Sequence, residues 1–344
     1  MTRARLSALL LALVLTTAIR AEIYELPPAG FDVIGAVSTI SARHEDTLVD
    51  VARRHGLGYE DIVRANPDVN VWVPGEGTEI ILPTQYVLPP GKRTGVILNL
   101  AEYRLYYFPE PADGESAYVL TYPISIGRMD WDTPLGLTTV ISKATNPTWY
   151  PPQSVRDEHA ADGDPLPRIV PPGPKNPLGK HAMRLGLPGY LIHSTNRPAG
   201  VGMRVTHGCI RMFPEDIEYL FAHIDIKTPV RIINAPVKMG WNGDELVMEA
   251  HPVLETTSPT VDEPMQIVIQ GDAPDVDEPV VAESDDIVIK DPLTFVTEQF
   301  ITATGERAGQ LDWYLAEVIV SRADGIPAAV GTGIKNAAAS AASE

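Results

Sequence analysis

Alternating apolar and polar positions fill the middle of the chain and predict β-strands. The segment GVILNLAEYRLYYFP reads as a β-hairpin that turns near Ala101 and Glu102. The series continues in five further segments: YVLTYPISIG, LTTVISKA, HAMRLGL, YLIHS and PVRIIN. Together they predict a mostly β domain over residues 95–234.

The region before this domain has a different pattern, because helical spacing appears between two strand-like segments. Residues 32–83 read strand, helix, helix, strand, with Asp46 as the N-cap of the first helix and Gly56 at its end. Asn66-Pro67 ends the second helix. A small βααβ domain is therefore expected over residues 32–83.

Helical spacing returns near the C-terminus, in DPLTFVTEQFITATG and LDWYLAEVIVSRADGIP. An acidic, Pro-containing segment, residues 255–290, precedes these helices and reads as a linker or an insertion. We expect a small α-containing subdomain over residues 235–330, interrupted by this linker. Residues 331–344 are expected to form a disordered tail.

Residues 146–179 break the strand rhythm with a long Pro-rich stretch that contains Trp149 and Tyr150. A loop this long inside a compact domain is usually functional, and its prolines lower the entropy lost on ordering it. We interpret the segment as a lid over a site. The alternative is a loop that only covers a sheet edge.

The first residues have the pattern of a secretory signal peptide. Arg3 and Arg5 precede an apolar run from Leu6 to Ala18, and Ala21 offers a small residue for cleavage before Glu22. The run is shorter than a membrane span, for which about 20 apolar residues are needed. We therefore expect residues 1–21 to be removed and the mature protein to be periplasmic rather than membrane-spanning.

The charge balance is strongly acidic. The chain carries 27 Lys and Arg against 45 Asp and Glu, a formal net charge of −18. Binding to nucleic acid requires clustered basic residues, so this composition argues against a nucleic-acid partner.

The segment RVTHGCIRM holds Cys209, the single cysteine of the chain. Exported proteins usually pair their cysteines, whereas an unpaired one suggests a reactive thiol. The alternative is a buried small apolar residue. A catalytic thiol needs a base or a positive field nearby, and His193, at the end of the strand YLIHS, is the candidate base. Gly208 permits close backbone approach, and the amides of Gly208 and Cys209 could donate to an oxyanion.

Four further residues are candidates for the same site. His207 lies two positions before Cys209, so on an extended segment both side chains point the same way. It could help to polarise the thiol or shape the pocket, the alternative being a packed, hydrogen-bonded histidine. Arg211 suits a substrate carboxylate, the alternative being a surface ion pair with Glu215 or Asp216. Trp149 and Tyr150 could wall the site or anchor the loop by packing. A zinc site of His193, His207 and Cys209 lacks the usual ligand spacings, and no metal is expected.

Two parts of the sequence resemble known families. Asp46-Thr47-Leu48 and Asn66-Pro67 are similar to a LysM module, which implies binding to glycans that contain N-acetylglucosamine. His193 followed by Thr206-His207-Gly208-Cys209 and Arg211 resembles the signature of L,D-transpeptidases with a YkuD-type catalytic domain. The resemblance extends to the Gram-negative members with an N-terminal LysM module, the group that includes the Braun lipoprotein-anchoring enzymes. It implies a YkuD-like β-sandwich with short helices for the catalytic domain.

The resemblance also implies a reaction. Cys209 would attack the carbonyl of the third residue, a diamino acid, of a stem tetrapeptide and release D-Ala, with His193 as base and then acid. The carbonyl of Ser194 would orient His193. An amine would then take the acyl group, giving a 3–3 cross-link or attachment to the lysine of an outer-membrane lipoprotein, whereas water would make the protein an L,D-carboxypeptidase. The implied partners are peptidoglycan stem peptides and glycan strands, with no cofactor. The rival hypothesis is a non-catalytic wall-binding protein that acts through its LysM module.

Overall fold

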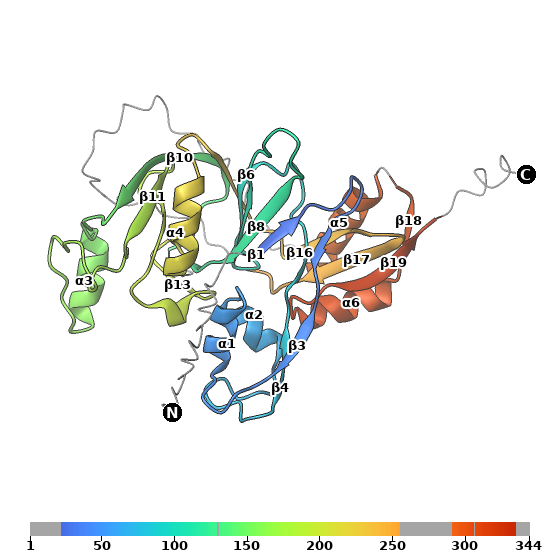
Figure 1. The fold of residues 1–344 in the computed structure, drawn as a ribbon, viewed down its shortest axis with the longest axis horizontal. Coiled ribbons are helices and arrows are strands. Elements are labelled where there is room, and N and C mark those ends of the chain that lie inside the picture. Colours follow the sequence, from blue (N-terminus) through green and yellow to red (C-terminus); the bar gives the residue numbers. More distant parts are fainter. Residues whose placement is uncertain (1–21, 129–130, 255–290, 306, 335–344) are drawn as a thin grey trace, which may run out of the picture.

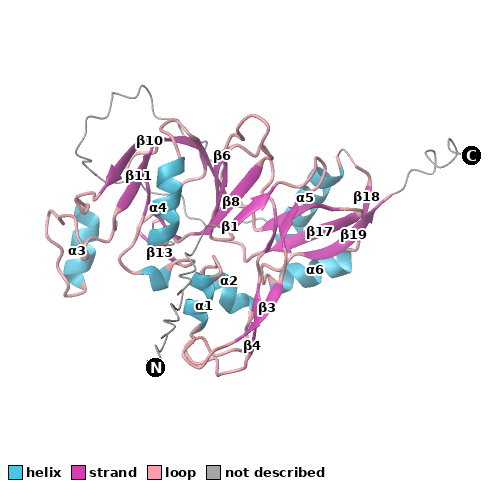
Figure 2. Ribbon diagram, viewed as in Figure 1, coloured by secondary structure: helices cyan, strands magenta, loops and turns pink. Residues whose placement is uncertain are grey.

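The computed structural model describes residues 22–128, 131–254, 291–305 and 307–334. The expected signal peptide and the acidic segment 255–290 lie outside these ranges. The described part has three units: a central unit built on a nine-stranded sheet, an N-terminal unit and a C-terminal unit (Figure 1). Figure 2 shows α4 (Pro214–His223) lying over the central sheet, α1 (Leu48–Arg54) and α2 (Tyr59–Ala65) in the N-terminal unit, and α5 (Pro292–Thr304) and α6 (Trp313–Arg322) beside the C-terminal strands.

The central sheet carries the strands expected between residues 95 and 234. Its strand order is β1-β8-β7-β6-β15-β10-β11-β12-β14. The bounds are β1 Glu22–Glu25, β6 Gly95–Asn99, β7 Arg104–Phe108, β8 Tyr118–Pro123, β10 Gly136–Thr145, β11 His181–Leu185, β12 Leu191–His193, β14 Ile210–Arg211 and β15 Pro229–Ile233. A separate parallel pair joins β9, Ile126–Gly127, to β13, Arg204–Thr206. The mostly β prediction for this region is confirmed.

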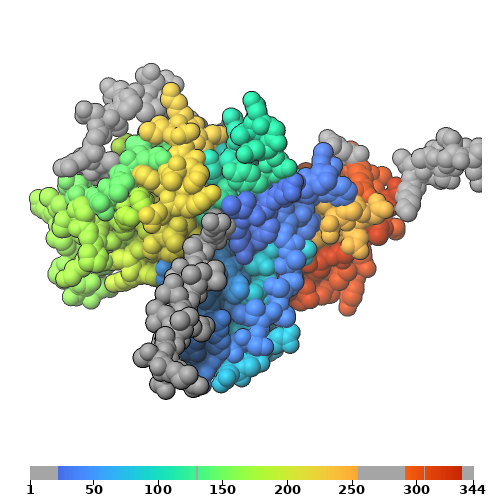
Figure 3. All heavy atoms as spheres, in the orientation of Figure 1, coloured from blue at the N-terminus to red at the C-terminus, as the bar shows by residue number. Residues whose placement is uncertain are grey.

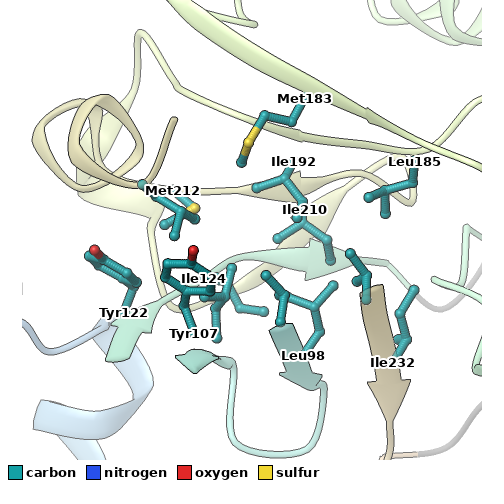
Figure 4. Packing of buried hydrophobic residues seen from close by; sticks show 14 of the residues in the cluster. Leu98, Tyr107, Tyr122, Ile124, Met183, Leu185, Ile192, Ile210, Met212 and Ile232 are labelled. Atoms are coloured by element: carbon teal, nitrogen blue, oxygen red, sulfur yellow. The ribbon is translucent and has the colours of Figure 1, made fainter. Parts of the chain in front are cut away.

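One large apolar cluster fills the concave side of this sheet. Leu98 and Leu105 face each other across the β6–β7 hairpin, and Ile192 and Ile210 face each other across β12 and β14. All four are at most 1% exposed and belong to the same cluster (Figure 4). Helix α4, Pro214–His223, covers it through Ile217 and Leu220. Burial of such side chains stabilises the fold by about 1.5–3 kcal/mol each.

The N-terminal unit has its own small core. Strand β3, Ser38–Ser41, pairs antiparallel with β4, Glu79–Leu82, and helices α1, Leu48–Arg54, and α2, Tyr59–Ala65, lie between them in the chain. A second pair, β2, Val33–Gly35, and β5, Gln85–Val87, leads to the central sheet. The N-cap of α1 is Thr47, whose hydroxyl accepts from the Asp50 amide. The prediction of Asp46 as the N-cap was wrong by one residue. The Asp46 carboxylate instead accepts a hydrogen bond from the Arg43 amide and pairs with Arg54.

The C-terminal unit contains a sheet that the helical pattern alone did not predict. Its strand order is β16-β17-β19-β18, with bounds β16 Val237–Asn242, β17 Glu245–Ala250, β18 Gly309–Leu311 and β19 Ala328–Gly333. The two expected helices are present as α5, Pro292–Thr304, and α6, Trp313–Arg322. The tail predicted from residue 331 begins too early, since Gly331 and Gly333 pair with Leu311 and Gly309.

The Pro-rich segment 146–179 is not a continuous loop. It contains α3, Gln153–Ala161, which the density of prolines hid in the sequence. Pro152 lies just before the helix and the left-handed Gly163 lies just after it, the arrangement typical of helix ends. Trp149 and Val170 exchange backbone hydrogen bonds, both 2.9 Å long, which closes the base of the segment.

The three units contact one another through specific polar bonds. The amide of Tyr59, at the start of α2, donates to the carbonyl of Val201 in the unit that contains the central sheet, and Arg53 pairs with Glu215 at 2.7 Å. On the other side, the amide of Val87 donates to the buried carboxylate of Glu249. In the space-filling view the blue N-terminal unit lies in front at the centre, with the teal, green and yellow unit of the central sheet above and to its left and the orange and red C-terminal unit to its right (Figure 3).

Candidate functional site

The candidate residues lie on one face of two adjacent strands. β12 and β14 run parallel, with Ile192 opposite Ile210 and His193 opposite Arg211. Because side chains alternate along a strand, the isoleucines enter the core and His193 and Arg211 point the other way. Cys209, two residues before Arg211, packs in a second apolar cluster with Trp149, Val155 and Leu191. The segment 146–179 therefore covers the face that carries the thiol.

Cys209 is a buried thiol. Its side chain is 4% exposed, and Sγ lies 3.6 Å from the carbonyl oxygen of Gly189. Burial raises the pKa of Cys209 to about 11, against smaller lowering effects of the Leu191 backbone and the Arg211 charge. A thiol with this pKa needs a base to remove its proton during attack.

His193 is held in the tautomer that a base requires. Its Nδ1 lies 2.6 Å from the carbonyl oxygen of Ser194. A carbonyl only accepts hydrogen bonds, so Nδ1 carries the proton and Nε2 is left as the acceptor. Burial, assisted by the positive charge of Arg211, lowers the pKa of His193 to about 3. The imidazole is therefore neutral at pH 7.

Two hydroxyl groups hold the backbone around the thiol. Thr206 Oγ1 donates to the carbonyl of Cys209 at 2.6 Å, and Thr133 Oγ1 donates to the carbonyl of Gly208 at 2.8 Å. Gly208 has φ +94°, and a Cβ there would lie 2.9 Å from Cε1 of Tyr190. Glycine is thus required for both the conformation and the space. The result is a fixed turn of backbone amides beside Cys209.

His207 does not follow the extended path that the spacing suggested. β13 ends at Thr206, and the positive φ of Gly208 breaks the extended backbone before Cys209. His207 Nε2 lies 3.1 Å from a carboxylate oxygen of Glu158 on α3, and its ring meets the Trp131 ring edge-on at 5.2 Å. The pKa of His207 is lowered, mainly because the imidazole is buried. The expectation that His207 and Cys209 point the same way rested on an extended segment that the structure lacks.

Arg211 is available to an anionic ligand. Among the described residues Arg211 forms no ion pair with Glu215, whose two oxygens accept from Arg53, nor with Asp216. The Nε of Arg211 is buried and has no hydrogen-bond partner among the described residues. A buried donor without a partner is costly, so a substrate carboxylate would relieve that cost.

Trp149 and Tyr150 differ in their surroundings. Trp149 is 9% exposed and packs in the cluster that contains Cys209. Tyr150, the next residue in the chain, is half-buried. Trp149 therefore anchors the segment and also packs in the cluster that holds the thiol. Its position is compatible with both interpretations, a wall of the site and a packing anchor of the loop.

A group of possible metal ligands lies elsewhere in the described part of the chain. Glu102, Glu249 and His251 place one ligand atom each within 4.8 Å of one another. The ammonium of Lys238 contacts both carboxylates, at 2.9 Å in the case of Glu249. This internal cation balances the charge where an ion would otherwise bind.

Sequence reasoning missed three residues of the site. Thr133, Glu158 and Arg128 lie 76, 51 and 81 positions before Cys209, in segments read as loop or strand end. For Glu158 a signal was present, since Pro152 and Gly163 bracket the nine residues of α3. For Thr133 and Arg128 the chain pattern offered none, because only the fold brings them to the motif.

Comparison with known proteins agrees with this geometry. The profile of the L,D-transpeptidase catalytic domain, YkuD, matches residues 93–232. The probable L,D-transpeptidase YcfS of Escherichia coli strain K12 is 39% identical over 251 residues, which cover 71% of this chain and 77% of that protein. The probable L,D-transpeptidase ErfK/SrfK of Salmonella typhimurium strain LT2 is 41% identical over 224 residues, covering 64% of this chain and 71% of that protein. The solved catalytic domain of an Enterococcus faecium L,D-transpeptidase aligns with 42% of this chain and 100% of its own length, at 23% identity and a TM-score of 0.31.

The chain belongs to the L,D-transpeptidase family. It is an enzyme, a cysteine-dependent acyltransferase that acts on peptidoglycan.

Proposed function

We propose that Cys209 is the nucleophile and His193 the general base of peptidoglycan transpeptidation. The observation that carries the proposal is the shared face of β12 and β14, on which the only thiol of the chain, the His193 imidazole and the Arg211 guanidinium converge. The Ser194 carbonyl supports the assignment, because its bond to Nδ1 leaves Nε2 free to take a proton.

The reaction begins from a neutral pair. The pKa of Cys209 is about 11 and that of His193 about 3, so thiol and imidazole are both uncharged at pH 7. The thiol proton passes to Nε2 as sulfur bonds to the carbonyl carbon of the third residue of a stem tetrapeptide. The C–N bond to D-Ala then breaks, and the imidazolium returns the proton to the leaving amine. A thioester on Cys209 and free D-Ala result.

The backbone amides of Gly208 and Cys209 would stabilise the tetrahedral oxyanion. Thr133 and Thr206 support this role, since their hydroxyls fix the carbonyls on either side of the Cys209 amide. Preorganised donors of this kind contribute about 2.7–4 kcal/mol each to transition-state stabilisation.

Arg211 would bind a carboxylate of the donor peptide. Its buried, unpartnered Nε supports this role, as does the absence of an ion pair with Glu215. Trp149 and Tyr150 would wall the donor side of the site, and His207 would shape it through its bond to α3.

The acceptor is proposed to be an amine. A second diamino acid would give a 3–3 cross-link, and the lysine of an outer-membrane lipoprotein would anchor the wall to that membrane. The burial of Cys209 under the segment 146–179 favours an amine over water, because it limits the access of solvent to the thioester.

The N-terminal unit, residues 32–83, would bind the glycan strand as a LysM-like domain. Its support is the order β3-α1-α2-β4 and the exposure of Trp72 and Val73, at 63% and 73%, in the loop after α2. Exposed aromatic and apolar side chains in one loop are typical of a binding surface. The catalytic domain would span residues 95–234, and the subdomain 235–330 would pack against it.

We place the enzyme in the periplasm, after removal of residues 1–21. In the described ranges each helix is too short or too polar to cross a bilayer.

The test uses residues 22–344 and the Cys209→Ala variant, each incubated with a disaccharide tetrapeptide and followed by mass spectrometry. A dimer formed with loss of D-Ala indicates 3–3 cross-linking. If only a tripeptide forms, a second incubation adds a lysine-ended lipoprotein peptide. Attachment of that peptide would show an amine acceptor, whereas continued release of tripeptide would show that water is the acceptor. Turnover by the Cys209→Ala variant, or none by the unmodified protein while it still binds glycan, would contradict the proposal.

A further inference from the structure

The lid helix α3 is connected to the catalytic motif through Glu158. The carboxylate of Glu158 accepts two hydrogen bonds from the Arg128 guanidinium, 2.8 and 2.9 Å long. One of its oxygens also lies 3.1 Å from Nε2 of His207. By contrast, Gln153 bonds to Asp157 and Arg156 within the helix itself.

Both partners of Glu158 belong to the backbone that holds the thiol. The amide of Arg128 donates to the carbonyl of Thr206 at 2.9 Å, and Thr206 in turn bonds to the carbonyl of Cys209. His207 is separated from Cys209 by Gly208 alone. A displacement of the Glu158 carboxylate would therefore move the backbone around Cys209 in two ways, through Arg128 and through His207.

The helix itself has few other sources of stability. It has nine residues, its N-cap Pro152 supplies no side-chain bond, and its first turn holds no acidic residue. Isolated helices of this length are not stable in water, so tertiary contacts decide whether α3 forms. Val155 is its one buried residue in the described structure.

Val155 and Glu158 share one face of α3, because residues three apart are neighbours on a helix. Val155 is 1% exposed and packs in the cluster that contains Cys209 and Leu191. The same helix face thus provides an apolar contact over the thiol and an ionic contact to the motif. The ionic contact persists across the working range of pH, because the Arg128 bond lowers the pKa of Glu158 to about 2.

We propose that Glu158 is a positioning residue for the reaction. By bridging Arg128 and His207, it holds α3 and Val155 over Cys209 and so encloses the donor peptide. This inference rests on the proposed role of Cys209 as the nucleophile. Glu158 touches neither thiol nor substrate, and its effect acts through the geometry of the lid.

The test compares Glu158→Gln with Asp157→Asn, which removes an equal charge from the same helix at an exposed position bonded only within it. Displacement of a positioned group by about 1 Å costs on the order of 100-fold in rate, so we expect Glu158→Gln to lower kcat/KM by about 10- to 100-fold, mainly through KM for the tetrapeptide. Opening of the lid should also speed the alkylation of Cys209 by iodoacetamide several-fold. Asp157→Asn should change neither quantity. Equal behaviour of the two variants in both measurements would overturn the inference.

Two controls separate this inference from the proposed function and from misfolding. If the unmodified protein and Cys209→Ala form no acyl-enzyme, the proposed function fails, whereas the alkylation rates of Glu158→Gln still report on the lid. If Glu158→Gln does not fold, Arg128→Gln breaks the same bridge from its other side and should give the same changes in KM and alkylation. Unchanged KM and alkylation in folded Arg128→Gln would equally overturn the inference.

Discussion

The Nδ1 atom of His193 lies 2.6 Å from the carbonyl oxygen of Ser194. This single bond determines which imidazole nitrogen is free to act, because a carbonyl can only accept. It does the work for which other catalytic triads use a carboxylate, and it does so without adding a negative charge beside a buried thiol. The uncharged partner is consistent with the low pKa of His193, about 3, because the Ser194 bond only partly offsets the lowering by burial and by the charge of Arg211.

Alkylation of the thiol should therefore depend on pH in a particular way. With a pKa of about 11 for Cys209 and about 3 for His193, the thiolate fraction increases tenfold per pH unit between pH 6 and 10. We expect the rate constant for inactivation by iodoacetamide to rise by about tenfold per unit over that range. A plateau between pH 5 and 8 would instead indicate a preformed thiolate–imidazolium pair.

Substitution of Gly208 should affect catalysis more than stability. In Gly208→Ala the new Cβ would lie 2.9 Å from Tyr190, and the residue would have to keep φ +94°. Displacement of the neighbouring amides should lower kcat by on the order of 100-fold. Gly114→Ala is the matched control, because Gly114 has φ +83° but no atom within 4 Å of its new Cβ. Equal activity of the two variants would contradict the role assigned to the Gly208 backbone.

The buried cluster between the catalytic and C-terminal units should be sensitive to loss of its cation. Lys238 is 0% exposed and contacts the carboxylates of Glu102 and Glu249. Lys238→Met leaves buried negative charge without a partner and should lower the free energy of unfolding by about 3–5 kcal/mol. Lys180→Met, which breaks an exposed pair with Glu218, should cost about 1 kcal/mol or less. Thermal or urea unfolding distinguishes the two, and similar losses would contradict this account.

Asp216 should make stability depend on pH. Burial, with repulsion from Glu215, raises the pKa of Asp216 to about 8, above its value in the unfolded chain. The folded state then holds a proton that the unfolded state releases between about pH 4 and 8, so stability falls as pH rises through this range. Asp216→Asn cannot ionise. We therefore expect its free energy of unfolding, measured relative to that of the unmodified protein, to increase by about 2–5 kcal/mol from pH 4 to pH 8.

Unfolding of Asp216→Asn and the unmodified protein at both pH values measures this difference. Glu218→Gln serves as a control on the same helix, since Glu218 is exposed. A difference between Asp216→Asn and the unmodified protein that does not change with pH would mean that Asp216 is ionised in the folded state.

Much of the central sheet could be predicted because its strands are apolar segments separated by turn signals. The β6–β7 hairpin turns where Ala101 and Glu102 were expected. Both of its faces are buried, Leu105 in one apolar cluster and Tyr106 in another, so the apolar character of the two strands marked them rather than an exposed face.

The strands of the C-terminal unit were missed. Trp241 and Met248 lie in an almost wholly buried hairpin, in which polar residues such as Lys238 are also buried. The alternating segment VKMGWN was a signal for β16 that the sequence reasoning did not use, whereas ELVMEA of β17 lacks a clear alternation.

The site was predictable where residues are adjacent in sequence and less so where the fold brings them together. Cys209, Gly208 and Arg211 form one short motif, and His193 ends an apolar strand. The expectation for His207 assumed an extended segment, which the left-handed Gly208 interrupts, a feature that spacing does not reveal. Glu158 was missed because its role depends on a helix packed across the motif.

The most direct measurement of the central claim is the mass of the acyl-enzyme. Residues 22–344 would be mixed with disaccharide tetrapeptide without an acceptor, quenched in acid within seconds, and analysed intact and after digestion. The account predicts an adduct equal to the donor minus D-Ala, located on the peptide that contains Cys209 and sensitive to hydroxylamine as a thioester is. An adduct on any other residue, or D-Ala release by Cys209→Ala, would contradict it.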